Sequence, residues 1–198
     1  MKNQITLVLA CLLSYFANAQ EMAIETKSVA IENIISYVIE NIDRNSEQDS
    51  LSLQNMTFLI QSSPNGLSIE DKVILKQAFK LVSKRLSEED NISIIAYSGI
   101  NGVALKKTSP KDLKKVMYAL ENYKSSIKEL HEDGIELAYA YAKENFEEDA
   151  INTVVMIRNP NAANVIATQN TATPKKKNNT ILITAIALLP EIISVIKD

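Results

Sequence analysis

The chain has 198 residues, and 24 Asp and Glu stand against 21 Lys and Arg, a mildly acidic balance that gives no general attraction to nucleic acid. It has 1 cysteine and 4 glycines, and neither common glycine-rich phosphate loop occurs in it. These features exclude a disulfide framework, a cysteine-based metal site and the usual nucleotide-binding loops.

The N-terminus has the order of a secretory signal peptide. Lys2 is followed by an apolar run from about Ile5 to Phe16 and then by small residues that end at Ala19. We expect cleavage after Ala19, leaving residues 1–19 as the signal, because a membrane anchor needs about 20 apolar residues. The single cysteine, Cys11, would leave with the signal. The mature protein is expected to be exported to the periplasm or outside the cell.

Residues 20–50 are expected to form an N-terminal helical segment and a polar linker. Isoleucine and valine recur at spacings near three and four between Ala23 and Ile42, with charged residues between them, which favours an amphipathic helix. The β-branched side chains weaken that preference. Residues 45–50 are polar throughout and read as the linker.

From residue 51 to residue 160, short apolar runs alternate with amphipathic helical patterns. The predicted strands are 56–61, 92–97, 103–105 and 153–157, and the predicted helices begin at Ser68, at Ser109-Pro110 and at about Glu129. Ser68 is the predicted N-cap of its helix, with Asp71 at the capping-box position. This alternation predicts an α/β fold, with a doubly wound, mostly parallel sheet flanked by helices, as in Rossmann-like domains.

The chain changes character after Arg158. Residues 161–180 read as a polar linker, and residues 181–198 as an apolar C-terminal helix. The apolar stretch from Ile181 to Ile196 is short for a membrane span and contains Pro190 and Glu191. We expect it to pack on the domain or on a partner, and we do not favour membrane association.

The order of these elements resembles a von Willebrand factor type A domain of the bacterial exported type. The resemblance covers roughly residues 55–160 and rests on TFLIQSSPNG, KVILKQAFKLVSKRL, SEEDNISIIAYSG, DGIELAYAYAKENF and INTVVMIRNP. It implies a doubly wound sheet with a metal site at the carboxyl ends of its strands. The last strands of the full domain have no counterpart here, so the sheet is expected to be incomplete at its C-terminal side.

The family's metal site uses an Asp-x-Ser-x-Ser motif after the first strand, a loop threonine, and the Asp of a Thr-Asp-Gly after the fourth strand. The resemblance implies that the matching positions of this chain are Gln61, Ser63 and Asn65, then Ser126 or its neighbour Ser125, and finally Arg158 and Asn159.

These departures remove the charges that a hard cation needs. Mg²⁺ prefers carboxylate oxygens and sheds water reluctantly. Gln61 and Asn159 are neutral where the family has aspartates, and Arg158 adds a positive charge. We therefore expect no Mg²⁺ and no other cofactor. The same residues are expected either to satisfy backbone groups in a buried loop or to contact a partner, with Arg158 pairing to a carboxylate.

No credible catalytic set emerges from the sequence. His131 is followed by Glu132 and Asp133, but the zinc motif H-E-x-x-H fails because residue 135 is Ile, so we interpret this run as a helix start. A Ser62 or Ser63 nucleophile paired with His131 and Asp133 would lack the G-x-S-x-G elbow.

The expected function is a non-catalytic, exported protein-protein interaction module that has lost metal binding and whose protein partner is unknown. Two alternatives stay open. One is a Mg²⁺-dependent adhesion domain of the same fold. The other is an envelope-associated accessory protein that docks through Ile181 to Ile196.

Overall fold

The structure is a computed structural model that describes residues 22–42 and 52–162 of the chain. The predicted signal peptide, the linker after residue 42 and the C-terminal segment that contains Ile181 to Ile196 lie outside the described residues. No helix within the described ranges is both long enough and apolar enough to cross a membrane.

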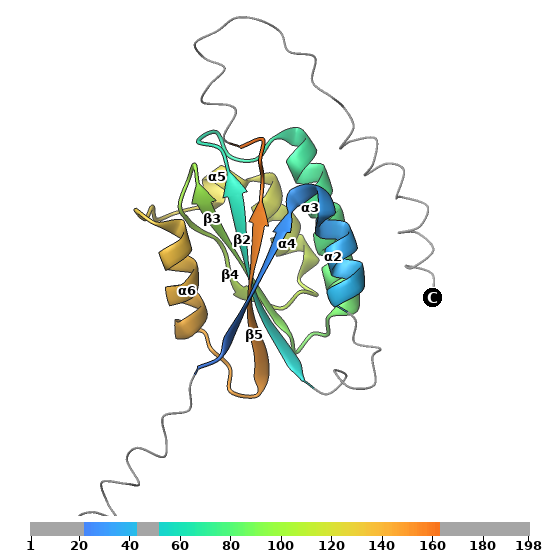
Figure 1. Ribbon diagram of the computed structural model, residues 1–198. Helices are drawn as coiled ribbons and strands as arrows, with labels where there is room; N and C mark the ends of the chain where they lie inside the picture. The colour runs from blue at the N-terminus through green and yellow to red at the C-terminus, as the bar shows by residue number, and fades with distance from the viewer. Residues whose placement is uncertain (1–21, 43–51, 163–198) are drawn as a thin grey trace, which may run out of the picture.

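A five-stranded sheet forms the centre of the molecule, with the strand order β1-β5-β2-β3-β4 (Figure 1). The strands are β1 Ile24–Ala30, β2 Leu53–Ser62, β3 Asn91–Ser98, β4 Gly102–Thr108 and β5 Ala150–Arg158. All neighbouring strands run parallel except β4, which is antiparallel to β3. The predicted mostly parallel α/β sheet is thereby confirmed.

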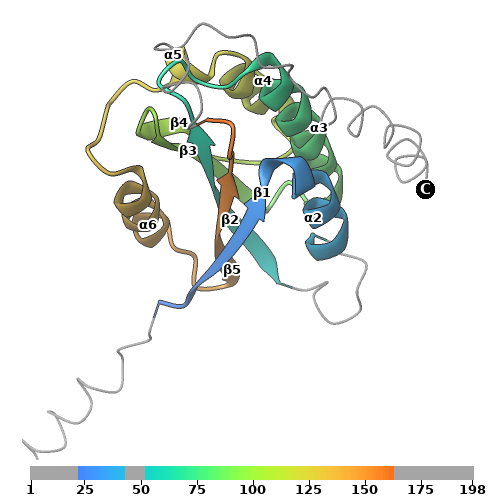
Figure 2. The same cartoon turned by 45° about the horizontal axis from the view of Figure 1, so that its top comes forward.

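Helices cover both faces of this sheet. They are η1 Ile31–Asn33, α2 Ile34–Asn41, α3 Ile69–Arg85, α4 Leu113–Glu121, α5 Tyr123–Ser126 and α6 Gly134–Glu144. In Figures 1 and 2, α2, α3 and α4 lie on one face, and α6 covers the other face alone within the described part of the chain.

The larger core lies under α2, α3 and α4. Phe58 and Ile60 of β2 point into it, and Phe58 meets Phe79 of α3 edge to face with ring centroids 4.8 Å apart. Leu59, between them, points to the α6 face and packs in a smaller cluster. β2 is buried on both faces, as expected of a central parallel strand.

Small residues let α6 lie close to the sheet. Gly134, Ala138 and Ala142 follow one another at a spacing of four and are buried on the sheet side. A Cβ at Gly134 would lie 2.6 Å from the carbonyl oxygen of Ala96 in β3, so the helix start has no space for a side chain.

The predicted amphipathic helix between Ala23 and Ile42 is wrong for residues 24–30. They form strand β1 rather than the first turns of a helix, and the α-helix occupies only Ile34–Asn41. β1 runs parallel to β5, with Ile24 opposite Asn152 and Ala30 opposite Arg158. The β-branched residues suit a strand, and the deciding partner lies far along the chain, where local periodicity carries no information. β1 thus occupies the sheet position beside β5.

Two helices begin later than predicted. α4 begins at Leu113 with Asp112 as its N-cap rather than at Ser109-Pro110, and α6 begins at Gly134 with Asp133 as its N-cap. Residues 127–133 form a connection past the start of β4, where the His131 N–H donates to the Asn101 carbonyl at 3.0 Å. This connection carries the chain from one face of the sheet to the other (Figure 2).

Candidate functional site

The chain path reverses direction across the sheet at β2. It passes from β2 to β3 on one side and returns to β5 on the other. Open α/β sheets bind ligands beyond the carboxyl ends of their strands at such a point. Five residues gather there from the ends of β2 and β5 and the first turn of α3, and we call them the switch-point site: Gln61, Ser62, Ser63, Asp71 and Asn159.

The turn after β2 is closed on itself. The Ser63 N–H donates to the Gly66 carbonyl at 3.2 Å, and the Gly66 N–H donates to the Ser63 carbonyl at 2.8 Å. The Ser63 hydroxyl also donates to the Gly66 carbonyl, at 2.8 Å, and accepts from the Asn65 N–H at 3.2 Å. Pro64 sets the first central dihedral of the turn, and Gly66 adopts φ +91°. The Ser63 hydroxyl therefore stabilises the turn.

The start of the β3–β4 connection packs against the backbone of this turn. A Cβ at Gly99 would lie 2.5 Å from the Ser62 carbonyl oxygen and closer still to the backbone of Ser63 and Pro64. Ser98, just before it, adopts φ +82°. The backbone contact leaves no space for a ligand on this side of the turn.

Asn159 joins the end of β5 to both neighbouring elements. Its backbone N–H donates to Gln61 Oε1 at 2.9 Å, and its side-chain amide donates to Asp71 Oδ2 at 2.9 Å. Its own Oδ1 accepts the Asn161 N–H at 3.1 Å. Asn159 is only 1% exposed. The two amides at the expected aspartate positions are therefore bonded within the protein.

Asp71 is the site residue that sequence reasoning missed. The predicted capping box is confirmed, because the Asp71 N–H donates to Ser68 Oγ and the Ser68 N–H donates to Asp71 Oδ2, each at 3.1 Å. The same carboxylate oxygen receives the amide of Asn159. A carboxylate in the first turn of the helix that follows β2 was the available signal, since that helix end faces the strand ends.

Arg158 lies on the α6 face of the sheet. Ile157 packs in the larger core, so the alternation of β5 turns Arg158 to the other face, where it is exposed. Burial raises the pKa of Tyr97 above its ordinary value, and the nearby positive charge of Arg158 opposes that shift. Arg158 is therefore an exposed cationic group near the ends of the strands that carry the switch-point site.

Ser126 is not brought to the switch-point site by any hydrogen bond. Its hydroxyl has no hydrogen-bond partner in the described part of the chain. The neighbouring Ser125 hydroxyl donates to the Asn122 carbonyl at 3.1 Å. α5 instead reaches the turn through Lys124, whose Nζ donates to the Pro64 carbonyl at 3.3 Å. The role expected of a loop hydroxyl at Ser126 or Ser125 stays a prediction.

The structure does not bring the residues of the hypothetical serine hydrolase together by hydrogen bonds within its described part. Asp133 Oδ1 caps α6 by accepting the N–H groups of Ile135 at 2.7 Å and Glu136 at 3.2 Å. His131 is exposed in the preceding connection. Among the described residues, the Ser63 hydroxyl is bonded within its own turn and not to His131 or Asp133. We therefore keep the interpretation of this run as the start of a helix, with Asp133 as its N-cap.

The switch-point site offers few negatively charged oxygen atoms to a metal ion. Asp71 is its single carboxylate, and the Ser62 hydroxyl is buried without a hydrogen-bond partner among the described residues. Within those residues no three His, Cys, Asp or Glu side chains gather closely enough to hold a metal ion. The arrangement suits internal hydrogen bonding better than coordination of a hard cation.

Comparison with known proteins adds one distant relative. The chain is similar to "Uncharacterized protein YfbK" of Escherichia coli (strain K12), with 32% identity over 114 residues, which is 58% of this chain and 20% of YfbK. The chain thus spans about one fifth of the length of that relative. No family model matches the chain, and no solved structure matches it. The name of that protein gives no activity.

Proposed function

We propose that the chain is a non-catalytic, exported protein-protein interaction module of the von Willebrand factor type A kind whose metal site has degenerated. The supporting observation is the bonding of Asn159 to both Gln61 and Asp71. The residue at the family's aspartate position holds the strand ends together and is 1% exposed. The side chain of Asn159 is therefore used for hydrogen bonds within the fold, and its oxygen already accepts the Asn161 N–H.

Metal binding at this site would require several bonds to be exchanged at once. A cation that used Asp71 would displace the amide of Asn159 and compete with the Ser68 N–H of the capping box. Removing a buried partner leaves an unsatisfied polar group, which costs about 1–3 kcal/mol each time. One carboxylate returns too little charge to offset that cost and the dehydration of Mg²⁺.

The rim of the site carries the groups through which we expect a partner to be contacted. Arg158 is exposed beside Tyr97, and Pro64 and Asn65 are exposed at the tip of the turn. A guanidinium binds a carboxylate through two parallel hydrogen bonds, which gives such a contact both strength and direction. We expect an acidic side chain of the partner to meet Arg158.

A second candidate function is metal-dependent adhesion. It is favoured by two groups at the same end of the sheet, the Asp71 carboxylate and the buried Ser62 hydroxyl, which has no hydrogen-bond partner among the described residues. In that case the bond between Asn159 and Asp71 would describe the metal-free form only. The experiment below separates the two functions.

The test restores the family pattern in one variant. Isothermal titration of Mg²⁺ is carried out on the native chain and on a Gln61→Asp/Asn65→Ser/Asn159→Asp variant. The native chain is expected to give no binding heat, whereas the variant gains two carboxylates at the strand ends and binds. Binding to the native chain would support metal-dependent adhesion. A folded variant that binds nothing would count against the proposed family relationship.

A further inference from the structure

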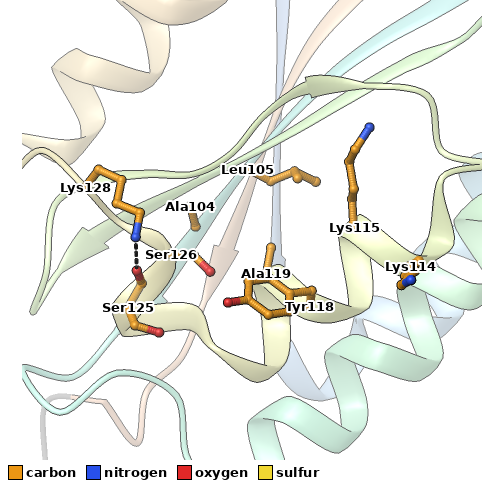
Figure 3. Close-up of a pocket in the computed structure, with 9 residues that line it drawn as sticks. All are labelled: Ala104, Leu105, Lys114, Lys115, Tyr118, Ala119, Ser125, Ser126 and Lys128. Carbon is orange, nitrogen blue, oxygen red and sulfur yellow. Dashed lines mark hydrogen bonds between the residues drawn. The ribbon is translucent and has the colours of Figure 1, made fainter.

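A cavity of about 390 Å³ lies between β4, α4 and α5, on the flank of the sheet and apart from the switch-point site. Figure 3 shows its lining residues, and we call it the lysine cavity. Its cationic members are Lys114, Lys115 and Lys128, and its apolar wall includes Ala104, Leu105 and the ring of Tyr118.

The lining of the lysine cavity is basic, although one of its lysines is paired with an acidic residue outside the lining. Three of its lining residues are lysines, and none of the lining residues within the described chain is acidic. Lys115 pairs with Asp112 at 2.5 Å on its own helix, and the Lys128 Nζ donates to the Ser125 carbonyl at 3.1 Å. In Figure 3, Lys128 stands across the ring of Tyr118 from Lys114 and Lys115. Cations on opposite sides of one hollow attract an anion that enters between them.

The apolar wall adds a second requirement for the ligand. The side chain of Tyr118 is 65% exposed, although large aromatic groups are usually covered. Ala104 is buried and Leu105 is half-buried behind it. Tyrosine is enriched at the anchor positions of protein-binding surfaces, and the apolar stems of lysines can cover area beside it.

A hydroxyl in the wall lacks a hydrogen-bond partner. The oxygen of Ser126 is buried and unpartnered within the described residues, and its side chain points toward Tyr118 and Ala119 in Figure 3. A ligand oxygen that reached this position would accept a hydrogen bond from the hydroxyl. The hydroxyl is thus a further donor on the same wall as Lys128.

We propose that the lysine cavity binds an acidic peptide segment of a partner protein, in which glutamate and leucine-like residues stand side by side. The carboxylates meet the lysines, and the apolar side chains meet Tyr118 and Leu105. Phosphate groups are usually held by an arginine fork or by a cradle of backbone N–H groups, and the lining has no arginine. The lining shares no residue with the switch-point site, so this proposal holds whether or not the switch-point site binds a metal ion.

The test is an NMR titration of the full, ¹⁵N-labelled chain with the peptide acetyl-Glu-Leu-Glu-Glu-Leu-amide. Its counterpart with glutamine in place of each glutamate is the neutral control. We expect the acidic peptide to shift the amide signals of Ala104, Tyr118 and Ser126, and the glutamine peptide to bind at least about tenfold more weakly, as expected when charge supplies the recognition.

Two lysine variants make the result specific. Lys114→Gln/Lys128→Gln is expected to weaken peptide binding at least about tenfold, whereas Lys80→Gln/Lys143→Gln, which changes two exposed lysines outside the cavity, leaves it unchanged. The proposal is overturned by the absence of shifts up to about 5 mM peptide, by equal binding of both peptides, or by equal binding of inorganic phosphate at the same signals. The last result would identify a general anion site.

Discussion

The side-chain amide of Asn159 donates to the carboxylate of Asp71 across 2.9 Å, although the two residues are 88 positions apart in the chain. This bond ties the end of β5 to the first turn of α3, next to the turn that follows β2. It places a neutral amide against the only carboxylate of the switch-point site. The interpretation of that site as a structural junction depends on this pair.

Breaking the pair is expected to destabilise the fold. Asn159→Ala removes the buried amide and leaves Asp71 with less hydrogen bonding, which should lower the free energy of unfolding by about 1–3 kcal/mol. Urea denaturation measures the change. Asn65→Ala, at the exposed tip of the turn, is the matched control and should change stability by less than about 0.5 kcal/mol. Equal effects of the two substitutions would contradict the structural role of Asn159.

Replacing Gly66 or Gly99 by alanine is expected to lower stability by different amounts. In Gly66→Ala the new Cβ meets only the Lys124 Cβ at 3.6 Å, so the cost comes from φ +91° and should be about 1–2 kcal/mol. In Gly99→Ala the Cβ would lie 2.5 Å from the Ser62 carbonyl oxygen, so the backbone must move and the cost should reach about 3 kcal/mol or more. Thermal unfolding of both variants tests this order, and the reverse order would contradict the packing at the turn.

Strand β1 should contribute to stability as part of the sheet. Val29 is 8% exposed on that strand, and Ser28 beside it is exposed. Val29→Asn should destabilise the protein by about 1–3 kcal/mol because a polar group replaces a buried apolar one, whereas Ser28→Asn should cost less than about 0.5 kcal/mol. Chemical denaturation distinguishes them. If neither substitution changes the free energy of unfolding, residues 24–30 do not take part in the cooperative fold.

Alkaline pH should destabilise the protein through Tyr123. Burial raises the pKa of Tyr123 well above its ordinary value, and its hydroxyl donates to the Ile60 carbonyl at 3.2 Å. Above pH of about 10 the unfolded chain releases this proton while the folded chain retains it, so stability is full below that pH and falls as pH rises.

The variant Tyr123→Phe tests that pH dependence. Its stability at pH 7 should fall by about 0.5–1.5 kcal/mol for the lost hydrogen bond, but its decline between pH 9 and pH 11 should be shallower than that of the native chain. Tyr118→Phe, at an exposed ring, serves as the control. Parallel pH profiles for the native chain and Tyr123→Phe would refute the assignment.

Local patterns in the sequence predicted the parts of the fold that local chemistry determines. The buried run before Ser62 and the capping box of Ser68 and Asp71 are confirmed, since strand burial and helix capping depend on neighbouring residues. The predicted helix over 24–30 is wrong, because the strand is fixed by pairing with β5 at the other end of the domain.

At the switch-point site too, contacts between residues far apart in the chain were harder to predict than local ones. The family resemblance implied that the strand ends carrying Gln61 and Asn159 meet, and the hydrogen bond from the Asn159 N–H to Gln61 agrees with this. The role of Asp71 was missed because its partner is 88 residues away. The placement of Ser126 at the site stays a prediction, and the contact from α5 to the turn that the structure does show comes from Lys124.

The most direct test of the central claim is a thermal melt of the chelated protein with and without millimolar Mg²⁺. A ligand at one hundred times its Kd stabilises a fold by about 2.7 kcal/mol, which raises the Tm of a domain this size by about 5–10 °C. The interaction-module account predicts an unchanged Tm. A rise of that size, lost in Asp71→Asn, would contradict it and establish a metal-dependent site at the switch point.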